Sequence, residues 1–246
     1  MRKRAKSTKW EAQNSSLAKI SKQETTYEQC RKYACEDIVS KLTHIEKQEV
    51  PFIVEIPENE EFHFIGRVNT TQGGNISKIY YKTFEDRNFV GFSTINKDNI
   101  SHYRGEIFFV YNIFPEDIVH IFPVDSDTKK HAKDEQDLTY LPSLWLNLQE
   151  LEDITNKLKV YNQITCKTKR NGKIIKPFAV IAFDKMDENI QRTAKEFGIG
   201  IIIIHPDKEA INYTGDLLYD EVQFDTVSRK IEQIYGIDIK SILYMD

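Results

Sequence analysis

The sequence predicts an α+β fold: an antiparallel N-terminal sheet with a backing helix, followed by a smaller α/β portion with a hairpin and a βαβ unit. Closely spaced β-rich segments between residues 51 and 123 predict the first part, because strands joined by short turns pair mainly as antiparallel hairpins and meanders. Two apolar runs that flank a helical segment within residues 173–204 predict the second part, since this order is typical of parallel strands. The chain has 246 residues, of which 40% are hydrophobic and 29% charged, and this leaves ample material for a core.

The first expected helix begins near Thr25, at the start of the stretch 25–128 that we assign to the N-terminal part. Thr25 and Glu28 have the spacing of a capping box, and apolar residues then recur at three- and four-residue steps as far as Ile45. We expect this apolar face to cover the sheet. The preceding residues 1–24 are expected to form a basic, poorly ordered segment, because they are mostly polar and their first nine residues hold five cations and no acid.

Six strands are expected in the N-terminal sheet. Each run is rich in β-branched and aromatic residues and is bounded by residues that favour turns. The expected strands comprise residues 51–56, 62–67, 76–84, 89–94, 106–113 and 117–123. A charged loop at residues 129–142 then separates the two parts of the chain.

The C-terminal portion, residues 143–246, is expected to pack on the first. Ser143 is expected to cap its first helix, and Asn171-Gly172 lies between two strands as the strongest short signal for a hairpin. Gly198 is expected to end the helix of the βαβ unit. The expected helices comprise residues 144–158, 187–197 and 224–235, and the expected strands residues 160–168, 173–183 and 199–204.

Composition excludes some classes of protein. Lys and Arg number 34 against 38 Asp and Glu, so the chain is not a general nucleic-acid coating protein, although a local basic patch is compatible with this balance. No apolar run approaches the roughly 18 residues of a membrane-spanning helix, and the basic run at residues 1–9 is not expected to be a secretory signal, because no apolar segment follows it. Cys30, Cys35 and Cys166 are dispersed and lack a zinc-site spacing, which favours reduced thiols in a cytoplasmic protein.

Two polar residues directly follow the two apolar strands of the expected βαβ unit. Asp184 comes after the first strand and His205 after the second. Ligands of open α/β sheets bind beyond the carboxyl ends of the strands, so a carboxylate and an imidazole at one edge could form an acid–base pair. The structural alternative is that Asp184 or Asp187 only caps the helix and that His205-Pro206 only turns the chain.

An acidic cluster permits a metal-dependent nuclease hypothesis. Glu116, Asp117, Asp125 and Asp127 could bind magnesium, but the chain contains no E-x-K string, and the last two acids fit a turn that closes a strand equally well. His120 alternates with apolar neighbours, which favours a buried, hydrogen-bonded histidine over a ligand. The sequence therefore indicates no metal site.

A third set of residues has the order of a known family. Arg67 ends one apolar run, Ser93-Thr94 end another, and Glu135 lies in a later acidic segment. This order resembles ADP-ribosyltransferases of the arginine–serine–glutamate type. The resemblance implies NAD as cofactor, with Arg67 holding its phosphates, Ser93 and Thr94 supporting the site, and Glu135 assisting transfer from the nicotinamide ribose. It covers about 70 residues and has departures, because Ile95 replaces the final serine of the motif.

Other residues leave the site assignment open. Gln163, rather than Glu135, could occupy the glutamate position, and this would weaken or abolish transfer. Tyr103 and Arg104 could clamp a planar anionic ligand such as a nucleotide, or form an ordinary turn.

Three functional hypotheses follow from these residues. The first is a cytoplasmic ADP-ribosyltransferase-like toxin or phage-defence effector, which binds NAD and modifies a protein or nucleic-acid target. The second is the metal-dependent nuclease. The third is a non-catalytic subunit of a multi-component system, which binds a protein partner through the basic N-terminus.

Overall fold

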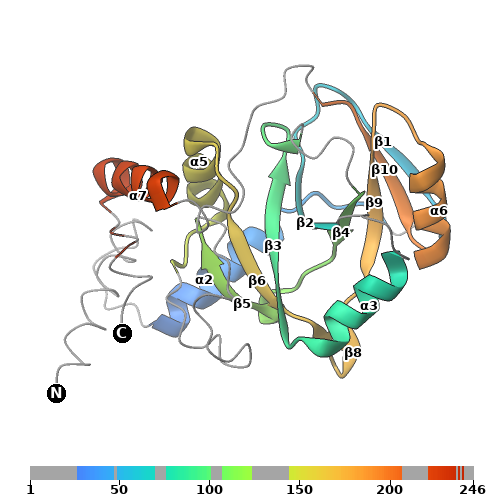
Figure 1. The fold of residues 1–246 in the computed structure, drawn as a ribbon, viewed down its shortest axis with the longest axis horizontal. Coiled ribbons are helices and arrows are strands. Elements are labelled where there is room, and N and C mark those ends of the chain that lie inside the picture. The colour runs from blue at the N-terminus through green and yellow to red at the C-terminus, as the bar shows by residue number, and fades with distance from the viewer. Residues whose placement is uncertain are drawn as a thin grey trace. The chain divides into compact units, whose positions relative to one another are not determined.

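The computed structural model describes residues 27–46, 49–69, 76–100, 107–123, 144–206 and 221–236, together with residues 238 and 240 (Figure 1). It confirms the α+β class, with several helices and a large mixed sheet. The chain forms two compact units, each built from segments that are distant in sequence. Unit 1 combines Met1–Lys41, Phe114–Ile164 and Thr214–Asp246, and unit 2 combines Leu42–Ile113 and Thr165–Tyr213. The sequence had instead predicted two consecutive parts, 25–128 and 143–246.

Unit 2 contains most of the sheet. In spatial order its strands are β1 (Ile53–Ile56), β10 (Gly200–Ile204), β9 (Pro177–Phe183), β4 (Ile107–Tyr111), β2 (His63–Asn69) and β3 (Phe89–Asn96). The first three are mutually parallel, whereas β4 is antiparallel to β9, β2 to β4 and β3 to β2. The unit therefore joins a parallel half to an antiparallel half within one sheet.

The strand at residues 53–56 is a correction to the sequence analysis. We expected it in the antiparallel N-terminal sheet, but β1 pairs in parallel with β10, about 150 residues later in the chain. Packing explains the choice of partner, because Gly200 of β10 has no side chain and the Phe52 ring lies where a Cβ atom at that position would be. The sequence shows both residues but not that they meet.

The segment at residues 76–84, which we expected to be a strand, is helical. α3 (Ile76–Asp86) buries Tyr80 and Phe84, which are four residues apart and stack with a ring-centroid distance of 4.4 Å. Tyr80 also contacts Phe109 of β4, with ring centroids 6.1 Å apart. Aromatic residues suggested a strand, but their four-residue spacing forms one face of a helix.

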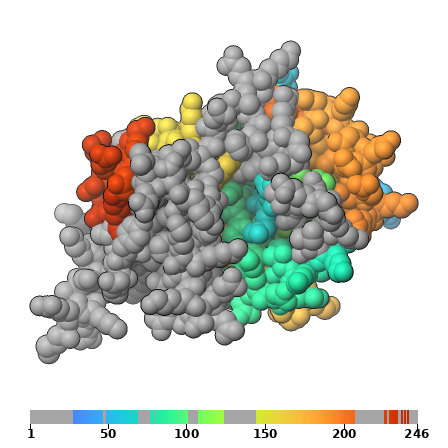
Figure 2. Space-filling view, in the orientation of Figure 1, coloured from blue at the N-terminus to red at the C-terminus, as the bar shows by residue number. Residues whose placement is uncertain are grey.

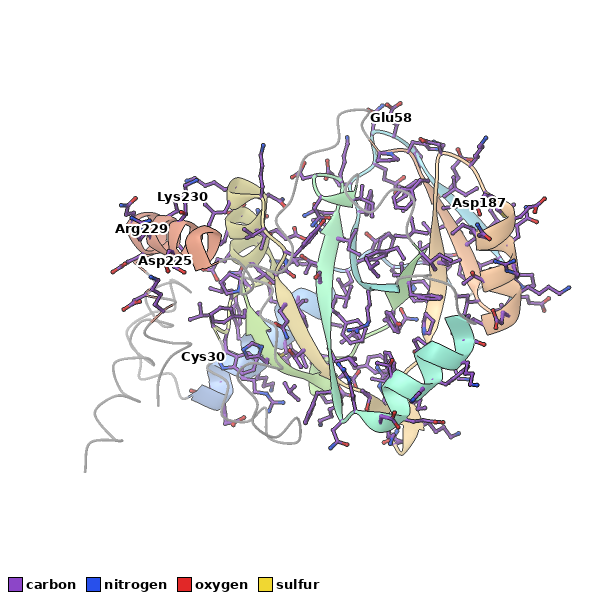
Figure 3. All side chains as sticks on the ribbon, viewed as in Figure 1. Cys30, Glu58, Asp187, Asp225, Arg229 and Lys230 are labelled. Carbon is purple, nitrogen blue, oxygen red and sulfur yellow. The ribbon has the colours of Figure 1, made fainter. Side chains whose placement is uncertain are left out.

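The βαβ unit and its caps are confirmed. α6 (Glu188–Phe197) connects the parallel strands β9 and β10, and the Asp187 carboxylate accepts a hydrogen bond from Ile190 N at its start (Figure 3). Gly198 ends the helix with a φ of 63°, in the left-handed region where glycine costs least.

The predicted Asn-Gly hairpin is also confirmed. β7 (Lys169–Arg170) and β8 (Lys173–Ile174) are antiparallel, and Asn171 and Gly172 have φ values of 51° and 73°. Two positive φ angles are those of a type I′ turn. The expected strand at residues 173–183 is divided, since β9 begins only at Pro177.

Unit 1 is described by its own helices and strands. They are α2 (Tyr27–Ser40), η2 (Pro115–Asp117), β5 (Ile118–Phe122), α5 (Leu148–Leu158) and α7 (Glu221–Tyr235). β6 (Gln163–Lys167) begins in unit 1 and ends in unit 2. Thr25 and Ser143, the caps expected from the sequence, lie outside the described residues. The helix that Ser143 was expected to cap at residues 144–158 begins only at Leu148, and its N-cap is Asn147.

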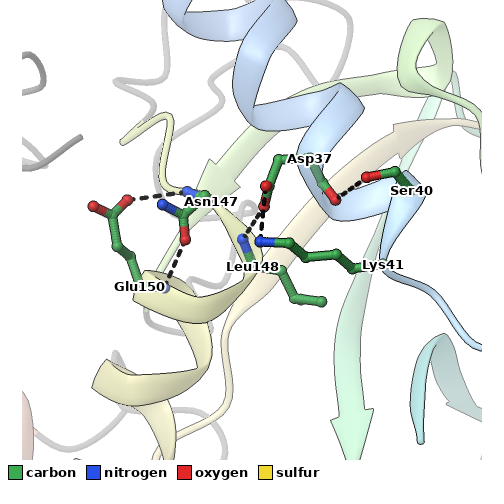
Figure 4. A network of polar contacts seen from close by, with 6 residues as sticks. All are labelled: Asp37, Ser40, Lys41, Asn147, Leu148 and Glu150. Carbon is green, nitrogen blue, oxygen red and sulfur yellow. Dashed lines mark hydrogen bonds and ion pairs between the residues drawn. The ribbon is translucent and has the colours of Figure 1, made fainter. Parts of the chain in front are cut away.

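Polar contacts join α2 to the start of α5 (Figure 4). The Asp37 carboxylate accepts a hydrogen bond from Leu148 N at 2.9 Å and pairs with Lys41 Nζ at 2.8 Å. Asn147 and Glu150 form a capping box, in which each side chain accepts from the other residue's backbone N–H. An acidic side chain on α2 thus satisfies a backbone donor that the first turn of α5 leaves free.

Candidate functional site

Three neighbouring parallel strands of unit 2 end at one edge of the sheet. Ile56 of β1 is in register with Ile204 of β10, and Ile204 is in register with Phe183 of β9. The residues that follow the last two strands, His205 and Asp184, therefore lie side by side, as the sequence predicted for this pair. We call this edge the rim.

A third residue, Glu55, completes the group at the rim. Glu55 Oε1 lies 2.7 Å from His205 Nε2, and Asp184 Oδ1 lies 3.7 Å from His205 Nδ1. The first distance is that of a hydrogen bond, whereas the second is within ion-pair range only. The imidazole is therefore held between two carboxylates, one on each ring nitrogen.

The backbone of Asp184 places its carboxylate beside the histidine. Asp184 has a φ of 59°, and its N–H donates to Ile204 O at 2.9 Å. Asp is one of the few residues other than glycine that adopts the left-handed region at modest cost, because its short polar side chain can hydrogen-bond locally. The turn at the end of β9 is thereby tied to β10, the strand that His205 follows.

The group is open to solvent on one side. The side chains of His205, Glu55 and Asp184 are 30%, 64% and 53% exposed. A ligand can therefore reach the imidazole while the sheet shields the rest of the ring. The first turn of α6 begins at Glu188, four residues after Asp184, and the N-terminus of a helix favours an anionic group nearby.

The arginine and serine of the family resemblance do not come together. In register, Gly66 lies opposite Ser93 and Ile65 opposite Thr94. Because side chains alternate along a strand, Arg67 shares a face of the sheet with Thr94, and Ser93 projects from the other face. Thr94 is fully buried. The residues present therefore do not fit the arrangement that the resemblance implies for NAD.

Arg67 has a structural setting of its own. Its guanidinium donates to Gly91 O at 2.7 Å, and its charge opposes the upward pKa shifts of Tyr80 and Tyr111. Burial is the main cause that raises the pKa of both tyrosines, and each phenol also affects the other. Arg67 thus belongs to a buried polar cluster beneath α3.

This buried cluster is separate from the rim. Arg67 is in register with Phe109, and Phe109 is in register with Val180. Val180 is in register with Ile201 of β10, which precedes His205 by four residues, or about 13 Å along the strand, and three strand spacings add roughly 14 Å across the sheet. Arg67 and His205 therefore cannot act on the same reacting atom.

The remaining sequence-predicted residues divide into two groups. Asp117 is buried and its carboxylate accepts from Phe114 N at 2.8 Å, so it caps η2. His120 is buried, as predicted, and stacks on Phe122 with a ring-centroid distance of 5.8 Å. Gln163 is buried at the start of β6. The residues Tyr103, Arg104, Asp125, Asp127 and Glu135 lie outside the described part of the chain.

The described residues also bear on metals, thiols and membranes. No group of three or more His, Cys, Asp or Glu side chains among them could hold a metal ion. Cys30, Cys35 and Cys166 are free and buried, and burial raises the pKa of the Cys35 thiol to about 12. None of the helices in the described ranges is long and apolar enough to cross a membrane.

Glu55 is the rim residue that the sequence analysis missed. A signal for it exists, because Glu55 is the single charged residue in the run Phe52-Ile53-Val54-Glu55-Ile56 and stands next to the end of that strand. Its relevance depends on the pairing of β1 with β10, which the sequence does not show. Comparison with known proteins adds no further assignment: no protein-family model, curated protein or solved structure matches this chain.

Proposed function

We propose that unit 2 is the catalytic part of an enzyme that transfers or hydrolyses the ADP-ribosyl group of a nucleotide such as NAD, with His205 as the general base. The proposal is based on the position of His205 between Glu55 and Asp184 at the rim. An oriented imidazole is the commonest proton acceptor in enzymes, and a neighbouring carboxylate sets its orientation and tautomer.

The proposed reaction uses each residue of the rim once. The bond between ribose C1′ and the nicotinamide nitrogen breaks, and nicotinamide leaves with the electron pair. A hydroxyl of water or of a target attacks C1′ and loses its proton to His205 Nδ1, which is 3.7 Å from Asp184 and makes no hydrogen bond to it, while Nε2–H donates to Glu55 Oε1. Glu55 and Asp184 supply negative charge, which stabilises an oxocarbenium-like transition state. The positive end of the α6 dipole favours the phosphates at the same edge.

The proposal places the chemistry at the rim instead of at Arg67 and Ser93. Arg67 already donates to Gly91 O, and Ser93 projects from the opposite face of the sheet. The rim offers carboxylates and a proton acceptor that solvent can reach. A contribution from Glu135 stays a prediction.

The experiment measures nicotinamide release from NAD by liquid chromatography, with and without a cell extract as a source of acceptors. His205→Gln should lower the rate by about 10²- to 10⁴-fold, since general base catalysis contributes that much. Glu55→Gln should lower it as well, because the amide keeps the shape of the carboxylate and removes its charge. Asp184→Asn is compatible with the same left-handed backbone.

Matched controls are available in the same unit. His44 is exposed, and His44→Gln makes the same chemical change away from the rim. Glu85, which is exposed on α3, provides Glu85→Gln as the control for Glu55→Gln. The proposal is wrong if the wild type releases no nicotinamide, or if the control variants lose as much activity as the rim variants.

A further inference from the structure

A second surface of unit 2 concentrates positive charge on the β7–β8 hairpin. The ten residues 167–176, KTKRNGKIIK, hold five cations and no acid, although the chain as a whole has a net charge of −4. The exposed cations are Lys167, Lys169, Lys173 and Lys176, and Arg170 is half-buried. Local charge of this kind sets what binds at a surface even when the net charge has the opposite sign.

The hairpin presents three lysines on one face. Lys169 is in register with Ile174, and Ile175 N donates to Thr168 O at 2.9 Å, so the pairing extends to the base of the hairpin. Because side chains alternate along each strand, Lys167, Lys169 and Lys176 share a face. A row of ammonium groups on an extended ribbon is suited to successive phosphates of a nucleic-acid strand.

The tip of the hairpin carries an unfavourable pair. Arg170 lies directly opposite Lys173, and like charges in this position destabilise a two-stranded ribbon. Among the described residues, no ion pair joins Lys167, Lys169 or Lys176 to a carboxylate.

The base of the hairpin is fixed to the rest of unit 2. Thr168 is buried, its hydroxyl donates to Arg87 O at 2.6 Å, and its N–H donates to Asn88 O at 2.9 Å. Lys176 Nζ lies 5.6 Å from the centroid of the Tyr81 ring on α3. Figure 2 shows the hairpin reaching the surface next to α3. The lysines therefore stand on a rigid support, which lowers the entropic cost of binding.

We propose that the β7–β8 hairpin is a nucleic-acid-binding surface, which contacts the phosphate backbone through Lys167, Lys169 and Lys176, the three lysines that share one face. It precedes β9, whereas the rim follows that strand, so seven residues, or about 23 Å, separate the two surfaces. The inference does not rest on the proposed reaction. Contacts to phosphates carry no sequence information, so binding should be independent of base sequence and sensitive to salt.

The experiment uses the full chain and fluorescein-labelled 20-nucleotide single-stranded RNA, single-stranded DNA and duplex DNA, with binding followed by fluorescence anisotropy at several salt concentrations. Lys167→Gln/Lys169→Gln should reduce the slope of log K against log salt by about 1.4 for single strands, since each phosphate contact contributes roughly 0.7. Relative to a 1 M salt reference, this corresponds to roughly 25-fold weaker binding at 0.1 M. Lys176→Gln should act in the same direction.

The matched control is Arg192→Gln/Lys195→Gln, which removes the same charge from exposed positions on α6 of the same unit. The proposal is supported if the wild type binds at least one of the three nucleic acids and only the hairpin variants lose affinity. The nucleic acid that binds most tightly is then the preferred strand type. The proposal is overturned if the wild type binds none of them at 50 mM salt, or if the control variant loses as much affinity. It is also overturned if a poly-glutamate peptide competes as well as nucleic acid of equal charge.

Discussion

The packing of Gly200 against Phe52 gives a sharp test of how the rim is built. A Cβ atom at Gly200 would lie 2.1–2.4 Å from three carbons of the Phe52 ring, whereas ordinary van der Waals contact begins near 3.4 Å. In Gly200→Ala the ring or the backbone of β1 must therefore move by about 1 Å or more. Because Phe52 is only 8% exposed, the ring has little room, and we expect a loss of about 1–3 kcal/mol in the free energy of unfolding.

A double-mutant cycle isolates this contact from other effects. Phe52→Ala alone should cost about 3–5 kcal/mol, because it empties a buried site. In Phe52→Ala/Gly200→Ala the added methyl group meets no ring, so the double variant should be close in stability to Phe52→Ala. The coupling between the two positions should then reach about 1–3 kcal/mol.

Urea unfolding followed by far-UV circular dichroism measures the three variants against the wild type, with the slope of the free energy against urea as a check on cooperativity. Costs that add within about 0.5 kcal/mol would refute the packing of Gly200 on Phe52. They would also remove the physical reason for the pairing of β1 with β10, and with it the position of Glu55 beside His205.

Two further predictions concern polar groups that are half-buried or buried. Burial raises the pKa of Glu150, so the folded state favours its neutral form. Its contribution to stability is present below about pH 4.3, the unfolded value, and is lost as pH rises through the raised folded value. Glu150→Gln preserves the capping box, and its free energy of unfolding should increase relative to that of the wild type as the pH rises. Urea unfolding of both proteins from pH 4 to 7 measures this. A difference in free energy of unfolding that stays constant with pH would contradict the prediction. Tyr80→Phe should cost about 1–3 kcal/mol, since it leaves the buried Ile175 O without its donor. Tyr111→Phe should reduce the stability less than Tyr80→Phe, because among the described residues no partner meets the Tyr111 hydroxyl in normal hydrogen-bond geometry. Equal losses of melting temperature in the two variants would contradict this prediction.

Elements with strong local signals could be predicted from the sequence. The Asn171-Gly172 turn needs two positive φ angles, which this dipeptide adopts readily, and the helix before Gly198 has its cap residues at both ends. The apolar runs on either side of that helix paired in parallel as expected, which placed Asp184 and His205 correctly. In these segments the local preference and the tertiary structure agree.

Elements that depend on distant partners could not be predicted in the same way. The aromatic residues of α3 have both strand propensity and helical spacing, and their packing on Phe109 favours the helix. The parallel pairing of β1 depends on Phe52 and Gly200, which are far apart in sequence. Glu55 became a candidate only through that pairing. The side chains of Arg67 and Ser93 lie on opposite faces of the sheet because of the register of β2 with β3. A shift of this register by one residue would place them on the same face.

The most direct measurement of the central claim is the rate of nicotinamide release from NAD by the wild type, His205→Gln and His44→Gln under the same conditions. If His205 accepts a proton at the rim, its variant should be slower by at least about 100-fold, and the His44 variant should match the wild type. Equal rates for the two histidine variants, or no release by the wild-type protein, would contradict the assignment of the rim as an active site.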